Sequence, residues 1–358
     1  MSDPSPSGGQ KLKVVVWDLD HTVWDGVLSE GDSLTLRPGV RACIEALDAR
    51  GVLQSVASRN DHGPAWTKLV DFGLAEYFLA PQINWGPKSE SIKALAQKIN
   101  VGLDTFALID DQPFERDEVA FSLPAVRVYD AGEIATLLAR DEFMPRFVTA
   151  DSRERRILYQ RDFARQEAET NFSGANDAFL ATLDMTLRVA PAEPGDLERV
   201  EELTLRTHQL NTTGKTFSHA ELEALRRSAG HRLLVAELDD RFGGYGKIGL
   251  VLLATTPTAW RVELFLMSCR VMSRGVGGAL ITWLRQEAKA AGVALQAHFI
   301  ETDRNRMMYV TYRFAGFEEI AEENGVSLLD NDLSDVPELP GYFAFEGRLT
   351  AVKEMATR

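Results

Sequence analysis

Two acidic motifs, each directly after a short apolar run, are the first residues of this chain that could do chemistry. Asp18 and Asp20 follow the run VVVW, and Asp110 and Asp111 follow the run FALI. Since side chains alternate along a strand, we expect Asp18 and Asp20 to project to the same side where the strand ends. Parallel strands end at one edge of a sheet, so three or four carboxylates could meet there. Hard oxygen ligands of this kind suit Mg2+, which commonly bridges to a phosphate group.

A phosphate site also needs donors and a positive charge, and the sequence supplies both. Ser58 ends the apolar run VLQSVAS, and Lys88 follows Gly86 and Pro87 at the start of a helix-like segment. A hydroxyl group and helix-terminal amides bind phosphate oxygens, while the Lys88 ammonium balances the carboxylates. A purely structural interpretation remains open, in which the strand-end aspartates cap helices and Lys88 is a surface lysine.

The order D-x-D-x-T, then Ser, then Lys, then D-D resembles the haloacid dehalogenase superfamily of phosphotransferases. The resemblance implies that Asp18 attacks phosphorus and that Asp20 acts as general acid and then as base. It implies a Mg2+ ion, without deciding which member of the D-D pair contacts it. The implied metal ligands are Asp18, Asp20, Asp110 and Asp111. The implied phosphate-binding and substrate-binding residues are Thr22, Ser58, Arg59, Asn60 and Lys88.

The elements that position these residues follow from the periodicity. Short apolar runs alternate with amphipathic helical patterns over 12–140, which predicts a doubly wound α/β domain with a parallel sheet. The resemblance implies that this domain is haloacid dehalogenase-like, and the short segment after the D-x-D-x-T motif leaves room only for a small cap. A charged helical connector is expected over 141–185, followed at 186–330 by an antiparallel meander in an α+β domain. We expect a disordered tail over 1–11 and a C-terminal extension over 331–358.

Longer strings carry a closer resemblance. They are DLDHTVWDGVLSEG, SRND, INWGPKSESI and LIDDQPFERDEV, followed by RTHQLNTTGKTFS and LFLMSCRVMSRGVGGAL. Together they are similar to the FkbH-like enzymes of polyketide biosynthesis, over about residues 12–320. The resemblance implies removal of phosphate from 1,3-bisphosphoglycerate, a small phosphorylated three-carbon acid. It also implies transfer of the glyceryl group to the phosphopantetheine thiol of an acyl carrier protein.

Two departures bear on the transfer step. Leu19 stands where many relatives have a cysteine between the motif aspartates, and His21 replaces the commoner asparagine. Because leucine cannot form a thioester, transfer requires direct attack by the carrier thiol, another cysteine or a different substrate. Cys269 is the candidate for a covalent, catalytic role, since Cys43 lies in a helix pattern typical of a core.

The second domain resembles the GCN5-related acyltransferase fold. In its loop SRGVGGAL, the amides near Gly275 and Gly277 are candidates for binding a pantetheine pyrophosphate at a helix N-terminus. Met272 replaces the usual Arg or Gln, and the alternative is that these glycines only begin a tightly packed helix. His208 and Asn211 form a polar island that is expected either to line a site for the pantetheine arm or to serve turn chemistry.

Composition narrows the functional classes. The chain has 358 residues with 53 Asp and Glu against 39 Lys and Arg, and its net charge of −14 disfavours nucleic acid. We find no apolar stretch of about 18 residues, which argues against a membrane role. Two cysteines are too few for a disulfide scaffold, and the first ten residues lack the apolar core of a secretory signal. The reducing cytoplasm is the expected compartment.

Three hypotheses follow from these patterns. The first is an FkbH-like enzyme with Mg2+-dependent phosphoryl chemistry and acyl delivery to a carrier protein. The second is a phosphatase that acts on a carrier-bound or small phosphoester, with a second domain that only binds. The third is a non-catalytic module that recruits a carrier protein, although so many like charges at one site would be costly without a metal.

Overall fold

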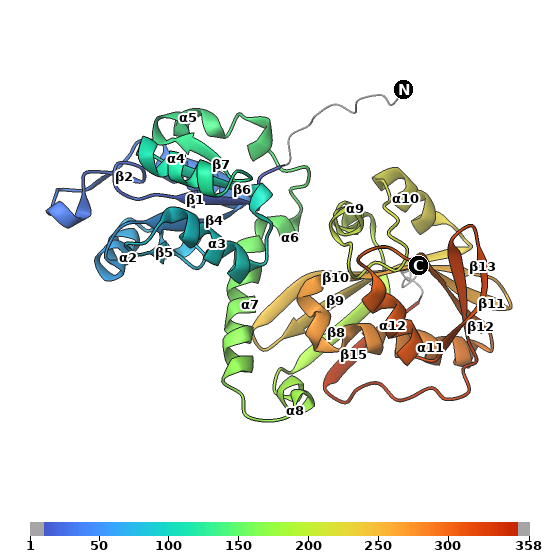
Figure 1. Ribbon diagram of the computed structural model, residues 1–358. Coiled ribbons are helices and arrows are strands. Elements are labelled where there is room, and N and C mark those ends of the chain that lie inside the picture. Colours follow the sequence, from blue (N-terminus) through green and yellow to red (C-terminus); the bar gives the residue numbers. More distant parts are fainter. Residues whose placement is uncertain (1–10, 350–358) are drawn as a thin grey trace, which may run out of the picture. The chain divides into compact units, whose positions relative to one another are not determined.

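The computed structural model describes residues 11–349, which form two compact units that divide between Gln160 and Arg161 (Figure 1). The expected tail over 1–11, apart from Lys11, lies outside the described residues, as does the end of the expected extension over 331–358. The expected connector at 141–185 is helical, but its residues are divided between the two units.

A five-stranded parallel sheet forms the centre of the first unit. Its strand order is β5 (Gln82–Ile83), β4 (Leu53–Ser58), β1 (Val14–Trp17), β6 (Phe106–Asp110) and β7 (Arg127–Asp130). Every residue of β1, β4 and β6 is buried, so both faces of the sheet are covered, as continuous apolar runs predict. The carboxyl ends of the strands therefore lie along one edge.

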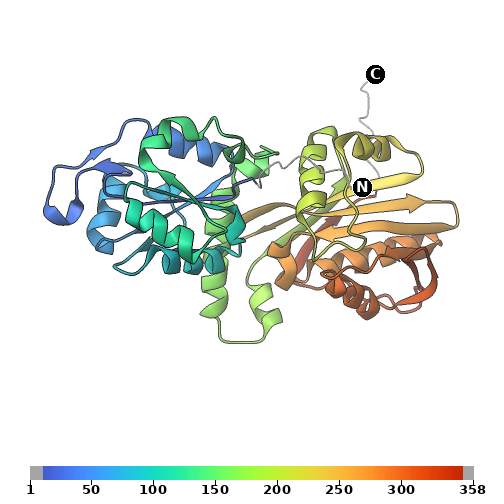
Figure 2. The same cartoon turned by 45° about the horizontal axis from the view of Figure 1, so that its top comes forward.

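Helices between and after these strands cover the sheet (Figures 1 and 2). They are α1 (Val40–Ala49), α2 (His62–Asp71), α3 (Lys88–Ile99), α4 (Pro113–Ser122), α5 (Ile134–Leu137) and α6 (Ala150–Arg153). The short 3-10 helices are η1 (Leu28–Glu30), η2 (Ala75–Tyr77), η3 (Leu103–Thr105), η4 (Ala131–Glu133) and η5 (Asp141–Phe143). Helix α1 packs against α5, and α3 packs against α4. Between β1 and α1 stands only η1 within a hairpin of β2 (Trp24–Asp25) and β3 (Thr35–Leu36), which is a small cap.

An eight-stranded mixed sheet forms the centre of the second unit. Its order is β13 (Phe317–Glu323), β14 (Val326–Asn331), β12 (Ala294–Phe299), β11 (Ala259–Met267), β10 (Gly243–Thr255), β9 (His231–Asp240), β8 (Met185–Pro191) and β15 (Phe343–Gly347). Strands β9, β10 and β11 follow one another through short turns and form the predicted antiparallel meander. Strand β8 pairs antiparallel with β9 across the long connection of residues 192–230, while β12 pairs parallel with β11 and β15 pairs parallel with β8. Because β15 is a strand of this sheet, residues 343–347 are not a mere extension of the domain.

The helices of the second unit lie around this sheet. They are α7 (Arg155–Thr170), which spans the division between the units, α8 (Asn176–Ala181), α9 (Leu197–Arg206), α10 (His219–Arg227), α11 (Val276–Ala291) and α12 (Arg306–Phe314), with η6 (Pro194–Asp196) and η7 (Cys269–Arg274). Arg165 of α7 is buried and pairs with Asp240, with 2.7 Å between Nε and Oδ2. Its guanidinium also lies over the Tyr245 ring, which ties α7 to the sheet.

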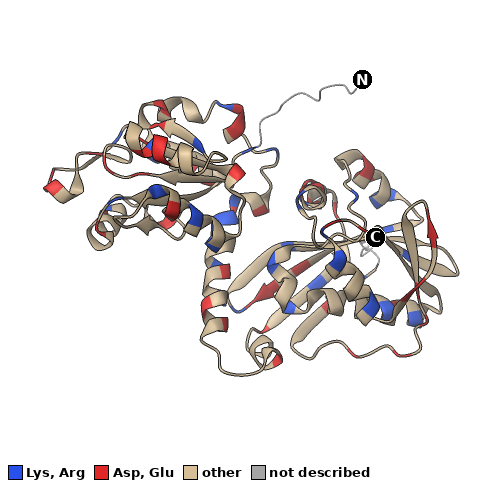
Figure 3. Ribbon diagram, viewed as in Figure 1, with Lys and Arg blue, Asp and Glu red and all other residues tan. Residues whose placement is uncertain are grey.

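Acidic and basic residues are interspersed along the elements of both units (Figure 3). Among residues 11–349, no helix combines the length and the apolar character that a bilayer span requires. The predicted fold class is confirmed: a doubly wound parallel α/β unit with a small cap is followed by an α+β unit built on a mixed sheet.

Candidate active site

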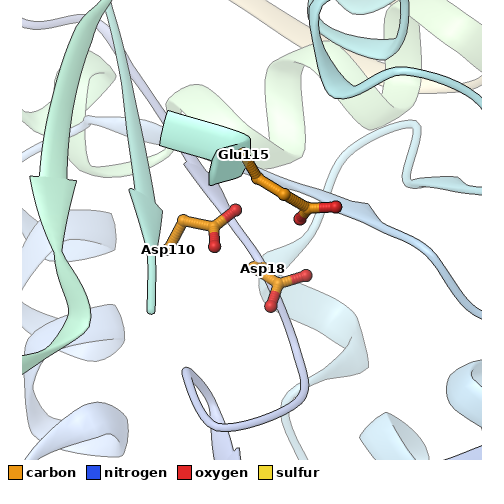
Figure 4. Close-up of side chains that lie close together, drawn as sticks. All are labelled: Asp18, Asp110 and Glu115. Atoms are coloured by element: carbon orange, nitrogen blue, oxygen red, sulfur yellow. The ribbon is translucent and has the colours of Figure 1, made fainter. Parts of the chain in front are cut away.

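Three carboxylates meet at the carboxyl edge of the parallel sheet. Asp18 directly follows β1, Asp110 ends β6, and Glu115 lies in the first turn of α4. One carboxylate oxygen from each lies within 4.8 Å of the others, and Figure 4 shows the three side chains close together. Asp18 and Asp110 are buried, so their charges need partners inside the protein.

The Lys88 ammonium is that partner. Its Nζ atom lies 2.8 Å from Asp18 Oδ1 and also contacts the carboxylates of Asp110 and Glu115. Only 2% of Lys88 is exposed, and burial alone would lower its pKa, but the three carboxylates raise the pKa above its usual value. Lys88 is therefore a fixed positive charge. Burial raises the pKa of Asp18 to about 7, against the lowering effect of Lys88.

A second group of polar side chains lies around Asp20. Asp20 Oδ1 accepts hydrogen bonds from Trp24 Nε1 at 2.7 Å and from the Leu28 amide at 3.1 Å. Asp20 Oδ2 accepts one from Asn60 Nδ2 at 2.9 Å. The same Asn60 nitrogen lies 3.2 Å from Ser58 Oγ, so Asn60 links Asp20 to the end of β4. Ser58 and Asn60 are both buried.

The carboxylate of Asp20 is consequently not part of the three-carboxylate cluster. Strand β1 ends at Trp17, so the alternation of side chains along a strand does not extend as far as Asp20. The chain turns instead, and His21 has a φ of 54°. Asparagine, aspartate and histidine adopt this left-handed conformation more readily than most residues, which explains how His21 can occupy the position.

Of the D-D pair, only Asp110 belongs to the cluster. The Asp111 amide donates to Thr22 Oγ1 at 3.1 Å, and Gln112 Nε2 donates to Asp111 Oδ2 at 2.8 Å. Thr22 is fully buried, and this hydrogen bond holds the backbone that follows β6 in place. Asp110, and not Asp111, is the member of the pair whose carboxylate lies with those of Asp18 and Glu115.

Glu115 is the cluster member that the sequence analysis missed. An acidic residue in the first turn of a helix is common, because it complements the helix dipole, and so attracts no notice. The signal that could have found it was its spacing. The chain turns directly from the end of β6 into α4, and this turn brings Glu115, the fifth residue after Asp110, back over the strand end. Glu115 also binds Arg59, with 3.1 Å between Oε1 and Nε.

The donor set fits Mg2+. Three carboxylates face two cationic side chains, Lys88 and Arg59, so one negative charge of the ionised set is left unbalanced. Carboxylate oxygens are the hard ligands that Mg2+ prefers. The residues that would hold the ion are Asp18, Asp110 and Glu115.

The polar island of the second unit has a structural role in the turn after α9. Asn211 is buried, and its Oδ1 accepts hydrogen bonds from the amides of Thr213 at 3.1 Å and Gly214 at 2.8 Å. Its Nδ2 donates to the Lys215 carbonyl at 3.2 Å. His208 is exposed. Asn211 thus matches the turn-chemistry alternative, and nothing in this geometry brings it together with His208.

The glycine loop before α11 is occupied by the protein's own side chains. Gly275 has a φ of 73°, and a Cβ atom there would collide with the Tyr342 hydroxyl. A Cβ atom at Gly277 would lie 2.6 Å from Met267 Cε. These contacts match the alternative in which the glycines begin a tightly packed helix.

The two cysteines lie in different units and differ in exposure. Cys269 is exposed at the start of η7, in the second unit. Cys43 is buried in α1, and burial raises the pKa of its thiol to about 11. Leu19, between the motif aspartates, is completely buried.

No family model matches the sequence, and no curated protein matches it. One similar solved structure is the N-terminal part of BF1531 from Bacteroides fragilis, which contains a phosphatase domain complexed with Mg. It is 24% identical over 40% of this chain, with a TM-score of 0.35. The chain covers 43% of that structure. Another is the ribosomal-protein-S18-alanine N-acetyltransferase from Escherichia coli, with 15% identity over 43% of this chain and 97% of that one and a TM-score of 0.34. A third is Ard1 from Thermoplasma volcanium, with 16% identity over 40% of this chain and 95% of that one and a TM-score of 0.32.

Proposed function

We propose that the first unit catalyses Mg2+-dependent phosphoryl transfer and that the whole protein delivers a glyceryl group from 1,3-bisphosphoglycerate to the thiol of an acyl carrier protein. The observation that carries the proposal is the buried Lys88 ammonium among the carboxylates of Asp18, Asp110 and Glu115. A purely structural salt bridge would not need three carboxylates around one ammonium at the ligand-binding edge of the sheet.

In the proposed reaction, an Asp18 oxygen attacks the phosphorus of the phosphate ester. The bond from phosphorus to the substrate oxygen breaks, and Asp20 donates a proton to that oxygen. Water then attacks the aspartyl phosphate, Asp20 accepts the proton of the water, and inorganic phosphate leaves as Asp18 is restored. A Mg2+ ion held by Asp18, Asp110 and Glu115 would supply positive charge opposite the negative charge of the phosphoryl group. Asn60 holds Asp20 in place, and Lys88 balances the charge of Asp18.

The acyl step joins this chemistry to the carrier. The carrier thiol attacks the acyl carbon of 1,3-bisphosphoglycerate, its proton passes to solvent, a carbon–sulfur bond forms, and the acyl phosphate leaves as inorganic phosphate. The small cap of β2 and β3 supports a carrier-borne partner, because it leaves the site open to large molecules. Cys269, which is exposed, is the candidate thiol for a relay of the glyceryl group.

A second candidate is a phosphatase that acts on a small or carrier-bound phosphoester. Two observations favour it: Leu19 supplies no thiol beside Asp18, and the spaces beside Gly275 and Gly277 are filled by the protein itself. In that case the second unit would only bind a partner.

The test is an incubation of the protein with Mg2+, 1,3-bisphosphoglycerate and a pantetheinylated carrier, followed by phosphate assay and by intact masses of both proteins. We expect a glyceryl adduct on the carrier that disappears with Asp18→Asn and persists with Asp117→Asn, an exposed residue on α4. Loss of the adduct with Cys269→Ala would establish the relay. Phosphate release without an adduct supports the second candidate, and full function of Asp18→Asn would leave only a non-catalytic module.

A further inference from the structure

Two exposed aromatic side chains flank the site. Trp85 is 62% exposed and lies two residues after β5, and Phe114 is 72% exposed and directly precedes Glu115 in α4. Burial of a large aromatic side chain is strongly favourable. Two such side chains exposed beside one site therefore indicate that a ligand covers them when it binds.

The strand order places the two residues on opposite sides of Asp18. Strand β5 lies beside β4, β1 follows, and β6, which leads to Phe114, lies beyond β1. The pairing of β5 with β4 continues to the strand end, because the Asn84 amide donates to the Ser58 carbonyl at 3.1 Å. With strands about 4.8 Å apart, the Trp85 backbone lies roughly 10 Å along the sheet edge from Asp18.

Trp85 is held in place although it is exposed. Its Nε1 donates to Asp61 Oδ1 at 3.0 Å, and Asp61 directly follows Asn60 in the β4 to α2 loop. The Gly86 amide donates to Asn84 Oδ1 at 2.8 Å, which orders the loop that carries the indole. The polar edge of the indole is therefore already satisfied, and an oriented ring remains partly open to solvent, which suits contact with an uncharged, extended ligand.

We propose that Trp85, with Phe114 on the other side, is the surface on which the pantetheine arm of the acyl acceptor lies when its thiol reaches the site. This inference rests on the proposed function and names the residues that recognise the acceptor. A phosphorylated three-carbon acid is charged and short, so it gains little from an aromatic side chain at this distance. The pantetheine arm is uncharged and extended, and its methyl and amide groups pack against aromatic rings.

The test compares two acceptor thiols, pantetheine and the shorter N-acetylcysteamine, with 1,3-bisphosphoglycerate and Mg2+. For Trp85→Ala we expect the ratio of KM for pantetheine to KM for N-acetylcysteamine to rise about tenfold, and for Phe114→Ala to rise by a smaller factor. Trp85→Phe should restore most of the wild-type ratio. Phe121→Ala is the matched control, since Phe121 is 88% exposed two turns further along α4.

A ratio that stays at the wild-type value in Trp85→Ala, or that rises as much in Phe121→Ala, overturns the inference.

Binding of pantetheine to the Asp18→Asn protein, measured by calorimetry, is independent of turnover. If no thioester forms with either thiol in the wild-type protein, the acyl-transfer part of the proposed function fails. The inference about Trp85 is still supported if adding Trp85→Ala to the Asp18→Asn protein weakens pantetheine binding about tenfold. It is contradicted if pantetheine does not bind to the Asp18→Asn protein, or binds equally well with and without Trp85→Ala.

Discussion

The Lys88 ammonium lies 2.8 Å from the Asp18 carboxylate, and both side chains are buried at the carboxyl edge of the parallel sheet. Because Asp110 and Glu115 contact the same ammonium, Lys88 is the group that allows three carboxylates to lie together. Its loss would leave like charges facing one another in a poorly solvated place.

Lys88→Met is therefore expected to destabilise the first unit by about 3–5 kcal/mol, the usual effect of removing one partner of a buried ion pair. Urea unfolding followed by circular dichroism measures this change. Mg2+ should recover part of the loss in the variant, because an ion that binds only the folded state stabilises it. Lys93→Met is the control: Lys93 pairs on the surface with Glu90, so its loss should cost less than about 1 kcal/mol. Equal effects of the two variants would contradict the assigned role.

Asn60→Ala should lower kcat for phosphate release, because Asp20 loses the side chain that orients it. The expected loss is about 100-fold, the low end of what general acid and base catalysis contributes. Asn60→Asp should be slower still, since it places a second carboxylate beside Asp20. Steady-state phosphate assays with Mg2+ measure both. Gln97→Ala, an exposed residue on α3, is the control and should behave as wild type. A normal kcat in Asn60→Ala would show that Asp20 does not need Asn60.

The site illustrates what strand ends do and do not predict. Asp18, Asp110 and Lys88 were predictable, because apolar runs locate strands and the ends of parallel strands share an edge. The direction of Asp20 was not, because alternation holds only within a strand and β1 ends at Trp17. Glu115 was missed because acidic residues begin many helices, and only its spacing from Asp110 sets it apart from them.

The fold shows the same limit at a larger scale. The meander of β9 to β11 was predictable from long apolar runs and short turns. Strand β15 was not, because its pattern is weak, Pro340 lies close by, and its pairing partner β8 is far away in the sequence. Pairing of distant segments is decided by the tertiary structure, which local patterns do not encode.

Gly275→Ala should destabilise the second unit by about 1–3 kcal/mol, because alanine is strained in the left-handed conformation and its Cβ atom would meet the Tyr342 hydroxyl. Chemical denaturation of the second unit is the measurement. Tyr342→Phe removes that hydroxyl, so the double variant should lose less than Gly275→Ala does. Gly278→Ala, in the first turn of α11, meets nothing within 4 Å and should be neutral or stabilising by up to about 1 kcal/mol. The same loss at both glycines would contradict the packing described here.

Thiol alkylation should distinguish the two cysteines. Burial raises the pKa of Cys43 to about 11, so its reactive thiolate is scarce at any lower pH, whereas Cys269 is exposed. Native protein treated with iodoacetamide at pH 8 should carry one adduct, at Cys269, and unfolded protein should carry two. Cys269→Ala should leave the native protein unlabelled. Labelling of Cys43 in the folded protein would contradict its burial.

The most direct test of the central claim is to trap the covalent intermediate. The protein is mixed with Mg2+ and 1,3-bisphosphoglycerate, quenched in acid within a turnover and analysed by intact mass and peptide mapping. We predict a mass increase of one phosphoryl group located on Asp18, absent without Mg2+ and absent in Asp18→Asn. Phosphate release by wild-type protein with no adduct at any quench time, or an adduct that persists in Asp18→Asn, would contradict the assignment of Asp18 as the nucleophile.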